Sequence, residues 1–261
     1  MPYYQIWENF IRQWSALGRL GSWTNPNSVP LYNNVIGGAL SSSYLPEPWW
    51  GNDGTKELHC VVVNYNPGQA DAMQRKGVVG YHSNYASDIV NSSPCVLPKT
   101  RRWHCSKRAK PVIDSLCRLG IVSSVSSCCL DNHLSIELIP WHTQSVSYGF
   151  SKYVDANVLN IFLYSICFAA HESRRIANKK LKSKVIFRMS SQRAKSFLVK
   201  LKAIGIECKF GNVYSTSSGN GKYMKFTINC LADVEFICVW GRRSRNDFPP
   251  QADMDEIMTK I

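Results

Sequence analysis

Short apolar segments separated by helical segments limit the folds that this chain can adopt. Four segments have the β-branched and aromatic composition of buried strands, namely 61–63, 134–139, 184–189 and 235–240. Apolar residues at helical spacing lie between them, at 111–119, 154–180 and 190–204. Strands joined through helices form parallel sheets with right-handed crossovers. The pattern therefore predicts an α/β fold, with three α/β/α layers around a central, mainly parallel four-stranded sheet and added peripheral elements.

Length and composition predict one domain. The chain has 261 residues, of which 44% are apolar, and this is enough for a large core. We expect residues 1–261 to fold together as three parts. These are an N-terminal helix near 4–17 followed by a Pro- and Trp-rich loop within 1–56, a core over 57–250, and a C-terminal tail at 251–261.

The sequence lacks the usual marks of a membrane, secreted or metal-binding protein. The apolar run 158–170 is interrupted by Asn160 and Ser165 and is too short to span a bilayer. Its 10 cysteines include no Cys-x-x-Cys pair, and no signal peptide is recognisable, so we expect reduced thiols and neither zinc nor iron–sulfur sites. These features predict a cytoplasmic protein without membrane association, metal or small-molecule cofactor. We expect a monomer, since no oligomerisation signal is present.

Basic residues cluster along the chain and predict a polyanionic partner. The formal net charge is +13, and a surface of that sign binds phosphates by releasing their counterions. Nucleic acid is the leading candidate, and a merely solvated basic surface is the alternative. The predicted DNA contacts are Arg101, Arg102, Lys107, Arg108, Arg188, Arg242, Arg243 and Arg245.

The first strand leads into a polar turn, Asn64-Tyr65-Asn66-Pro67-Gly68. In open α/β sheets the active site lies beyond the carboxyl ends of the strands. The other predicted strands end near residues 140, 190 and 241, so we expect their loops along the same edge as this turn. Gly68 lets a ligand approach the backbone closely. The turn is therefore either part of a site or an ordinary tight turn.

Residues 45–250 resemble the uracil-DNA glycosylase superfamily in the order of their segments and in this turn. In that family the first strand ends in a water-positioning motif, Gly-x-Asn-Pro-Gly or Gly-Gln-Asp-Pro-Tyr, and Asn66 would take the catalytic position. An Asn on the family's second strand reads the flipped pyrimidine, and Glu137 stands nearest that place. Residues 239–246 take the place of the family's His-Pro-Ser loop without sharing its residues, and Asn64 stands where Gly is usual. The resemblance implies a glycosylase that acts on double-stranded DNA with the target base flipped out.

Two residues carry the predicted base specificity. The ionised carboxylate of Glu137 only accepts hydrogen bonds, which suits the N4 amino group of cytosine better than the edge of uracil. Gly68 stands where some uracil enzymes place a Tyr against C5, so it leaves room for a C5 substituent. Together they indicate excision of a hydroxymethylated or glucosylated cytosine from foreign or phage DNA, leaving an abasic site.

Several alternatives stay open at this point. One is a glycosylase that repairs uracil or a damaged base, and another is a module that flips bases without chemistry. A purely structural carboxylate is the competing interpretation of Glu137. A metal-dependent nuclease is disfavoured, because Ile139 stands where a Glu-x-Lys motif needs Lys.

Other side chains extend the predicted site. Asp71 would activate water if its loop folds back, and His142 would contact a phosphate or the leaving base. Trp49 and Trp50 are adjacent and point in different directions, so one is expected to pack inward while the other stacks on a base. The predicted substrate contacts are Asn64, Tyr65, Pro67, Gly68, Glu137, Trp49, Trp50 and Trp141.

Overall fold

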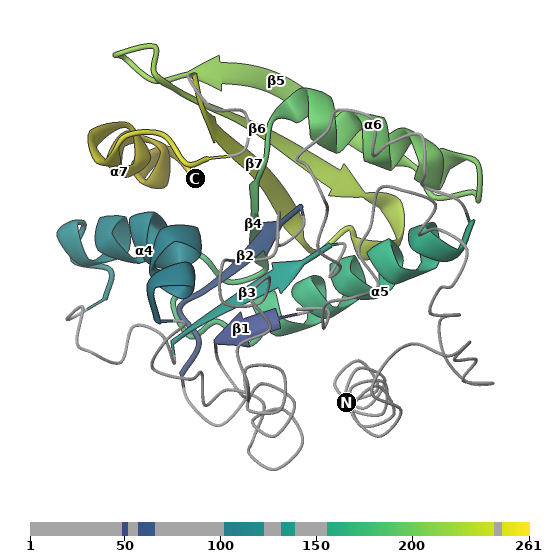
Figure 1. Cartoon of the computed structure of the whole chain (residues 1–261), viewed down its shortest axis with the longest axis horizontal. Coiled ribbons are helices and arrows are strands. Elements are labelled where there is room, and N and C mark those ends of the chain that lie inside the picture. The colour runs from purple at the N-terminus through teal and green to yellow at the C-terminus, as the bar shows by residue number, and fades with distance from the viewer. Residues whose placement is uncertain (1–48, 52–56, 66–101, 123–131, 139–155, 243–246) are drawn as a thin grey trace, which may run out of the picture.

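A seven-stranded mixed sheet forms the centre of the protein (Figure 1). The structure is a computed structural model that describes residues 49–51, 57–65, 102–122, 132–138, 156–242 and 247–261; Trp50 and parts of the first two helices are described by their backbone alone. The strands lie in the order β1-β3-β2-β4-β7-β6-β5. Their bounds are β1 Trp49–Gly51, β2 Cys60–Asn64, β3 His133–Glu137, β4 Lys184–Arg188, β5 Cys208–Ser215, β6 Gly221–Ile228 and β7 Glu235–Gly241.

The central strands β3, β2, β4 and β7 are parallel to one another, and β1, β5 and β6 pair antiparallel with their neighbours. This pairing confirms the predicted α/β class, but the sheet is larger than the predicted four strands. Residues 49–51 form an edge strand where an irregular loop was expected, because three residues are too few to show alternation. The strand β5 forms a hairpin with β6, and its register shifts between Phe210 and Val213. The sequence does not predict β5, because most of its residues are exposed and give no apolar pattern.

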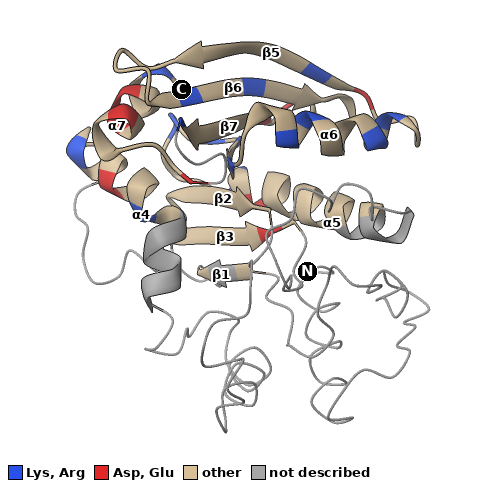
Figure 2. Cartoon of the chain, turned by 45° about the horizontal axis from the view of Figure 1, so that its top comes forward, with Lys and Arg blue, Asp and Glu red and all other residues tan. Residues whose placement is uncertain are grey.

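In the described part of the chain, four α-helices flank the sheet (Figures 1 and 2). On one side, α4 packs against α7, and the amide of Gln251 donates to the carbonyl of Pro111 at 3.0 Å. On the other side, α5 packs against α6 through the stacked rings of Phe162 and Phe197, whose centroids are 5.1 Å apart. None of these helices is long and apolar enough to cross a membrane. Their bounds are α4 Arg102–Arg118, α5 Ala156–Ser173, α6 Ser191–Lys202 and α7 Gln251–Lys260, with a short 3-10 helix at Asn229–Leu231.

Two helix boundaries differ from the predicted ones. Helix α4 begins at Arg102, so Pro111 lies inside it, although proline favours the first helical position. The Ser115 hydroxyl donates to the carbonyl of Pro111 at 3.0 Å within this helix. Helix α5 ends at Ser173, and residues 174–183 form turns rather than its predicted continuation.

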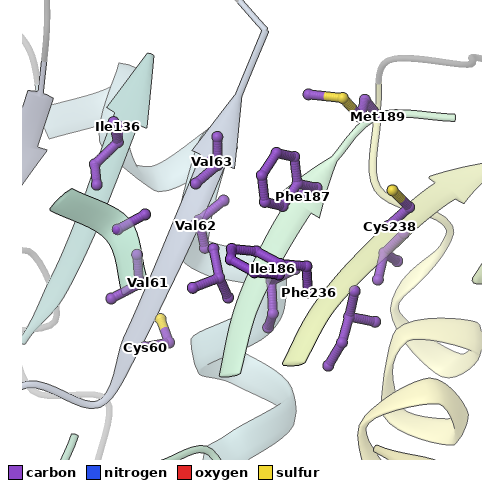
Figure 3. Close-up of a cluster of buried hydrophobic side chains, with 14 of the residues drawn as sticks. Cys60, Val61, Val62, Val63, Ile136, Ile186, Phe187, Met189, Phe236 and Cys238 are labelled. Atoms are coloured by element: carbon purple, nitrogen blue, oxygen red, sulfur yellow. The ribbon is translucent and has the colours of Figure 1, made fainter. Parts of the chain in front are cut away.

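The hydrophobic core covers both faces of the parallel strands (Figure 3). Residues 61–63 of β2 have no exposed surface. Phe187 of β4 packs edge-on against Phe226 and Phe236, with ring centroids 5.4 and 5.8 Å away. The helix predicted at 190–204 is confirmed by α6, which buries four apolar residues at helical spacing: Ala194, Phe197, Leu198 and Leu201.

Residues 251–261, expected to form a tail, belong to this core. The Ser115 hydroxyl of α4 bonds to the carboxylate of Asp255, 2.5 Å away, and so ties α7 to its neighbour. Three residues of α7 at i, i+3 and i+4 spacing have no exposed surface, and these are Met254, Ile257 and Met258. The helix therefore closes the sheet on the α4 side.

Replacing Ile257 with alanine is expected to lower the free energy of unfolding by about 2–5 kcal/mol, because the change deletes buried carbon atoms and leaves a cavity. Urea titration followed by circular dichroism measures this change. The control is Ala252→Ser on the exposed side of the same helix, which should alter stability by less than about 0.5 kcal/mol. Equal stability of the two variants would contradict the packing of α7.

Candidate functional site

The parallel strands β3, β2, β4 and β7 all end at one edge of the sheet. Next to this edge lies the topological switch point, where the order in which the chain adds strands reverses. The chain passes from β2 through α4 to β3 on one side, and then through α5 to β4 on the other side of β2. In open α/β sheets ligands bind at such a switch point, outside the carboxyl ends of the strands. Here the switch point lies between β2 and β4. The predicted common edge of strand ends is confirmed for the described residues.

Three polar residues occupy the last positions of adjacent strands: Glu137 in β3, Asn64 in β2 and Arg188 in β4. Asn64 and Glu137 are register partners. Residues 62–63 pair with 186–187, which puts Arg188 level with Asn64 in the next strand. Residues at equal register in parallel strands point to the same face, and neighbouring strands are about 4.8 Å apart. The sheet therefore aligns a carboxylate, an amide and a guanidinium, and we call these three residues the polar row.

Two of the three side chains in the polar row are buried. Asn64 is 3% exposed, and its Nδ2 donates to the Ser135 hydroxyl at 2.8 Å. Its Oδ1 has no hydrogen-bond partner among the described residues. Glu137 has no exposed surface, and its backbone carbonyl accepts a hydrogen bond from the Ser165 hydroxyl at 3.4 Å. A buried acceptor without a partner costs about 1–3 kcal/mol, so Asn64 Oδ1 marks a place where a ligand with a donor group would be stabilised.

The third member of the polar row, Arg188, is held by the segment that follows β7. Its guanidinium forms an ion pair with Asp247. The ring of Phe248 lies under it, 6.0 Å from the guanidinium carbon to the centroid. The Arg188 side chain is 19% exposed. Its charge is thus offset by a carboxylate in this structure, and contact with DNA remains a prediction.

Tyr65 lies directly after β2 and packs against α6. Its ring meets Phe197 edge-on at 4.9 Å between centroids, and the guanidinium of Arg193 lies 4.3 Å from its centroid. Burial raises the pKa of the Tyr65 phenol, and the positive charge of Arg193 opposes that rise. The first turn of α6 is fixed in turn by Ser190, whose hydroxyl accepts from the N–H of Arg193 at 3.4 Å. Tyr65 therefore joins the end of β2 to the start of α6, next to the switch point.

The two adjacent tryptophans lie in the edge strand β1. Trp49 is 2% exposed and belongs to the hydrophobic core, so it takes the inward-packing role that was predicted for one of the pair. Trp50 is the register partner of Ser135, the residue that accepts from Asn64. Strand β3 therefore lies between the backbone of Trp50 and the strand that carries the buried amide.

Much of the predicted site lies outside the described residues. The exposed residue Arg242 follows β7, and its backbone N–H donates to the carbonyl of Asn220 at 2.8 Å. Three predicted DNA contacts in α4 are described by their backbone alone, and these are Arg102, Lys107 and Arg108. The predicted residues outside the described ranges are Asn66, Pro67, Gly68, Asp71, Trp141, His142, Arg101, Arg243 and Arg245.

Three residues of this region are missed by sequence reasoning. Ser135 lies two positions before Glu137, so strand alternation places both on one face and would have indicated it. Arg193 lies three positions after the helix cap Ser190, but its contact with Tyr65 joins separate elements and has no local signal. Asp247 likewise reaches Arg188 from a distant part of the chain.

The described residues offer hydrogen-bond acceptors at the switch point. They include no group of three or more His, Cys, Asp or Glu side chains that could hold a metal ion. The buried oxygens of Asn64 and Glu137 instead place two acceptors next to each other at the switch point. Such a pair suits a ligand that presents an amino group.

Comparisons of the chain with known protein families, with curated protein sequences and with solved structures find no match.

Replacing Ser135 with alanine is expected to destabilise the protein by about 1–3 kcal/mol, because it leaves the buried Nδ2 of Asn64 without an acceptor. Urea unfolding of Ser135→Ala, Asn64→Leu and the double variant forms a thermodynamic cycle. The double variant should lose less stability than the two single losses added together. Ser196→Ala on the exposed side of α6 is the control. Strict additivity in the cycle would show that Asn64 and Ser135 do not interact.

Proposed function

We propose that this protein is a DNA glycosylase that flips a C5-substituted cytosine out of double-stranded DNA and excises it, leaving an abasic site. The observation that carries the proposal is the pair of buried acceptors in the polar row, Asn64 and Glu137, at the switch point of the sheet. The motif residue Asn66 follows Asn64 by two positions in the chain. The resemblance of residues 45–250 to the uracil-DNA glycosylase superfamily supports the same proposal.

The hydrogen-bonding character of the polar row favours cytosine over uracil. Cytosine presents an N4 amino group with two donor hydrogens, whereas uracil presents the O4 acceptor at the same place. The carboxylate of Glu137 and the Oδ1 of Asn64 are both acceptors, so together they satisfy an amino group and repel a carbonyl oxygen. A good pairing of this kind is worth about 1–3 kcal/mol of discrimination between bases.

The proposed reaction is hydrolysis of the N-glycosidic bond. A water oxygen bonds to C1′ of the sugar while the bond from C1′ to N1 breaks, and the base departs with the bonding electron pair. The base then takes up a proton, and the water gives up a proton to solvent. The sugar passes through an oxocarbenium-like state, so placement of water and stabilisation of the departing base carry much of the acceleration. Asn66 would place the water, since an amide is too weak a base to deprotonate it.

The charge of the protein fits this partner. Extraction of a nucleotide from the duplex costs a few kcal/mol, and contacts with the phosphates offset that cost. A net charge of +13 provides a large excess of basic residues for such contacts.

An assay for abasic sites tests the proposal. Duplexes of one sequence that contain cytosine, uracil, 5-hydroxymethylcytosine or glucosylated 5-hydroxymethylcytosine are incubated with the full chain and then cleaved with alkali. We expect strand breaks from the modified cytosines and none from unmodified cytosine. Asn66→Ala should slow the reaction about 10²-fold, in line with the loss of a positioned reactant. Release of uracil alone would overturn the assignment of cytosine, and DNA binding without any abasic product would favour a non-catalytic base-flipping module.

Glu137→Asn separates a base-reading role from a structural one. An amide donates as well as accepts, so this variant should lose about 5- to 150-fold in the rate on modified cytosine and gain activity on uracil relative to wild type. Single-turnover rates on both substrates measure the change. A purely structural Glu137 predicts an equal loss on both substrates together with a lower melting temperature.

Gly68→Tyr tests the predicted room at C5. A Tyr ring at this position should block glucosylated 5-hydroxymethylcytosine much more strongly than 5-hydroxymethylcytosine, because the glucosyl group is the larger substituent. Gly68→Ala is the matched control with a small side chain. Equal rates of Gly68→Tyr on the two substrates would show that residue 68 does not border the C5 substituent.

A further inference from the structure

Helix α6 carries positive charge on its solvent side. Its 12 residues include four basic and no acidic ones, and Figure 2 shows the basic residues along the helix. Lys195 and Lys202 are exposed, and they lie seven positions apart, about 10 Å along the helix axis. Arg193 and Lys200 repeat this spacing on the opposite flank of the helix's solvent side. We call these four residues the α6 basic face.

The charges of Lys195 and Lys202 differ from those of the two arginines in the segment before β4. In that segment Arg174 is paired with Asp233, and Arg175 is paired with Glu172. Among the described residues no carboxylate lies within ion-pair distance of Lys195 or Lys202; Lys195 Nζ lies 5.5 Å over the ring of Phe210 instead. Exposed cations without a carboxylate partner attract a polyanion.

The α6 basic face begins at the candidate site. Ser191 opens the helix three residues after Arg188, the last residue of β4. The Arg193 guanidinium rests on the ring of Tyr65, which follows Asn64 in the chain. The helix then extends away from the switch point over about 18 Å at about 1.5 Å per residue. This length matches about five nucleotides at about 3.4 Å per step of one DNA strand.

The apolar side of α6 disfavours a membrane as the partner. Helices that lie on membranes expose large apolar residues to the lipid. In α6 the residues Phe197, Leu198 and Leu201 are buried against the sheet, and Val199 is the exposed apolar residue of this helix at 63%. The exposed polar residues Gln192 and Ser196 lie between the basic ones and are suited to phosphate oxygens.

We propose that the α6 basic face binds the phosphate backbone of a DNA strand that leads out of the base site. The proposal rests on the proposed function in taking DNA as the partner, and it adds the surface and the direction of the bound strand. Each phosphate neutralised by a cation contributes about −0.9 to the slope of log Kobs against log salt on double-stranded DNA.

The test is binding of an unmodified, fluorescein-labelled 20-base-pair duplex to the full chain, measured by anisotropy between 50 and 200 mM salt. The variant is Lys195→Gln with Lys202→Gln. The matched control is Lys179→Gln with Lys182→Gln, because these exposed lysines lie before β4 at the other end of the strand and remove the same charge. We expect the α6 variant to bind at least 10-fold more weakly and to lose about 1.8 from the salt slope. The control should differ from wild type by less than 2-fold.

Three outcomes would overturn the proposal. One is a salt slope of the α6 variant equal to that of wild type with both proteins folded by circular dichroism, and another is an equal loss in the control. The third is stronger binding of the wild type to phosphatidylserine vesicles than to DNA, with the same dependence on Lys195 and Lys202. Because the duplex is unmodified, the result does not depend on base excision. If the protein excises bases but binds DNA equally well without Lys195 and Lys202, this proposal is wrong and the proposed function still stands.

Discussion

The burial of β2 on both faces is the constraint on which the structure depends. Residues 61–63 have no exposed surface and lie between β3 and β4, so the strand has no freedom to shift along its neighbours. A shift of one residue would turn every side chain to the opposite face. The register of β2 with its two neighbours places Asn64 beside Glu137 and Arg188 at the edge of the sheet. The polar row is thus aligned next to the buried apolar residues that precede it in the strands.

The polar row works against the stability that the core provides. Placing a carboxylate and a half-satisfied amide at fully buried positions is unfavourable unless hydrogen bonds compensate. Glu137 and Asn64 stand at the ends of two adjacent strands, at buried positions where apolar residues would pack well. Buried polar residues that lower stability at the carboxyl ends of the strands in an open α/β sheet usually belong to a ligand-binding site. This agrees with the proposed recognition of a base.

The sequence predicts the elements with strong periodicity and misses those defined by tertiary contacts. The valine run of β2 and the inward face of α6 are local patterns, and both are found where the pattern puts them. Strand alternation and a common strand edge suffice to bring Asn64 and Glu137 together. In contrast, β1 is too short for a pattern, and the 10 residues of α7 lie in a segment that the sequence predicts to be a tail. The ion pair between Arg188 and Asp247 joins residues 59 positions apart, and no local rule reveals it.

The two outer strands of the described sheet bear on how the protein behaves at high concentration. An open sheet edge is a template on which further strands can add and aggregate. At one edge β1 offers three residues, and at the other β5 is interrupted where its register shifts between Phe210 and Val213. Gly211 lies in that interruption, where a Cβ would come within 3.1 Å of the Lys225 carbonyl. Neither edge of the described sheet therefore presents a long straight run of unpaired backbone, and this disfavours the addition of further strands.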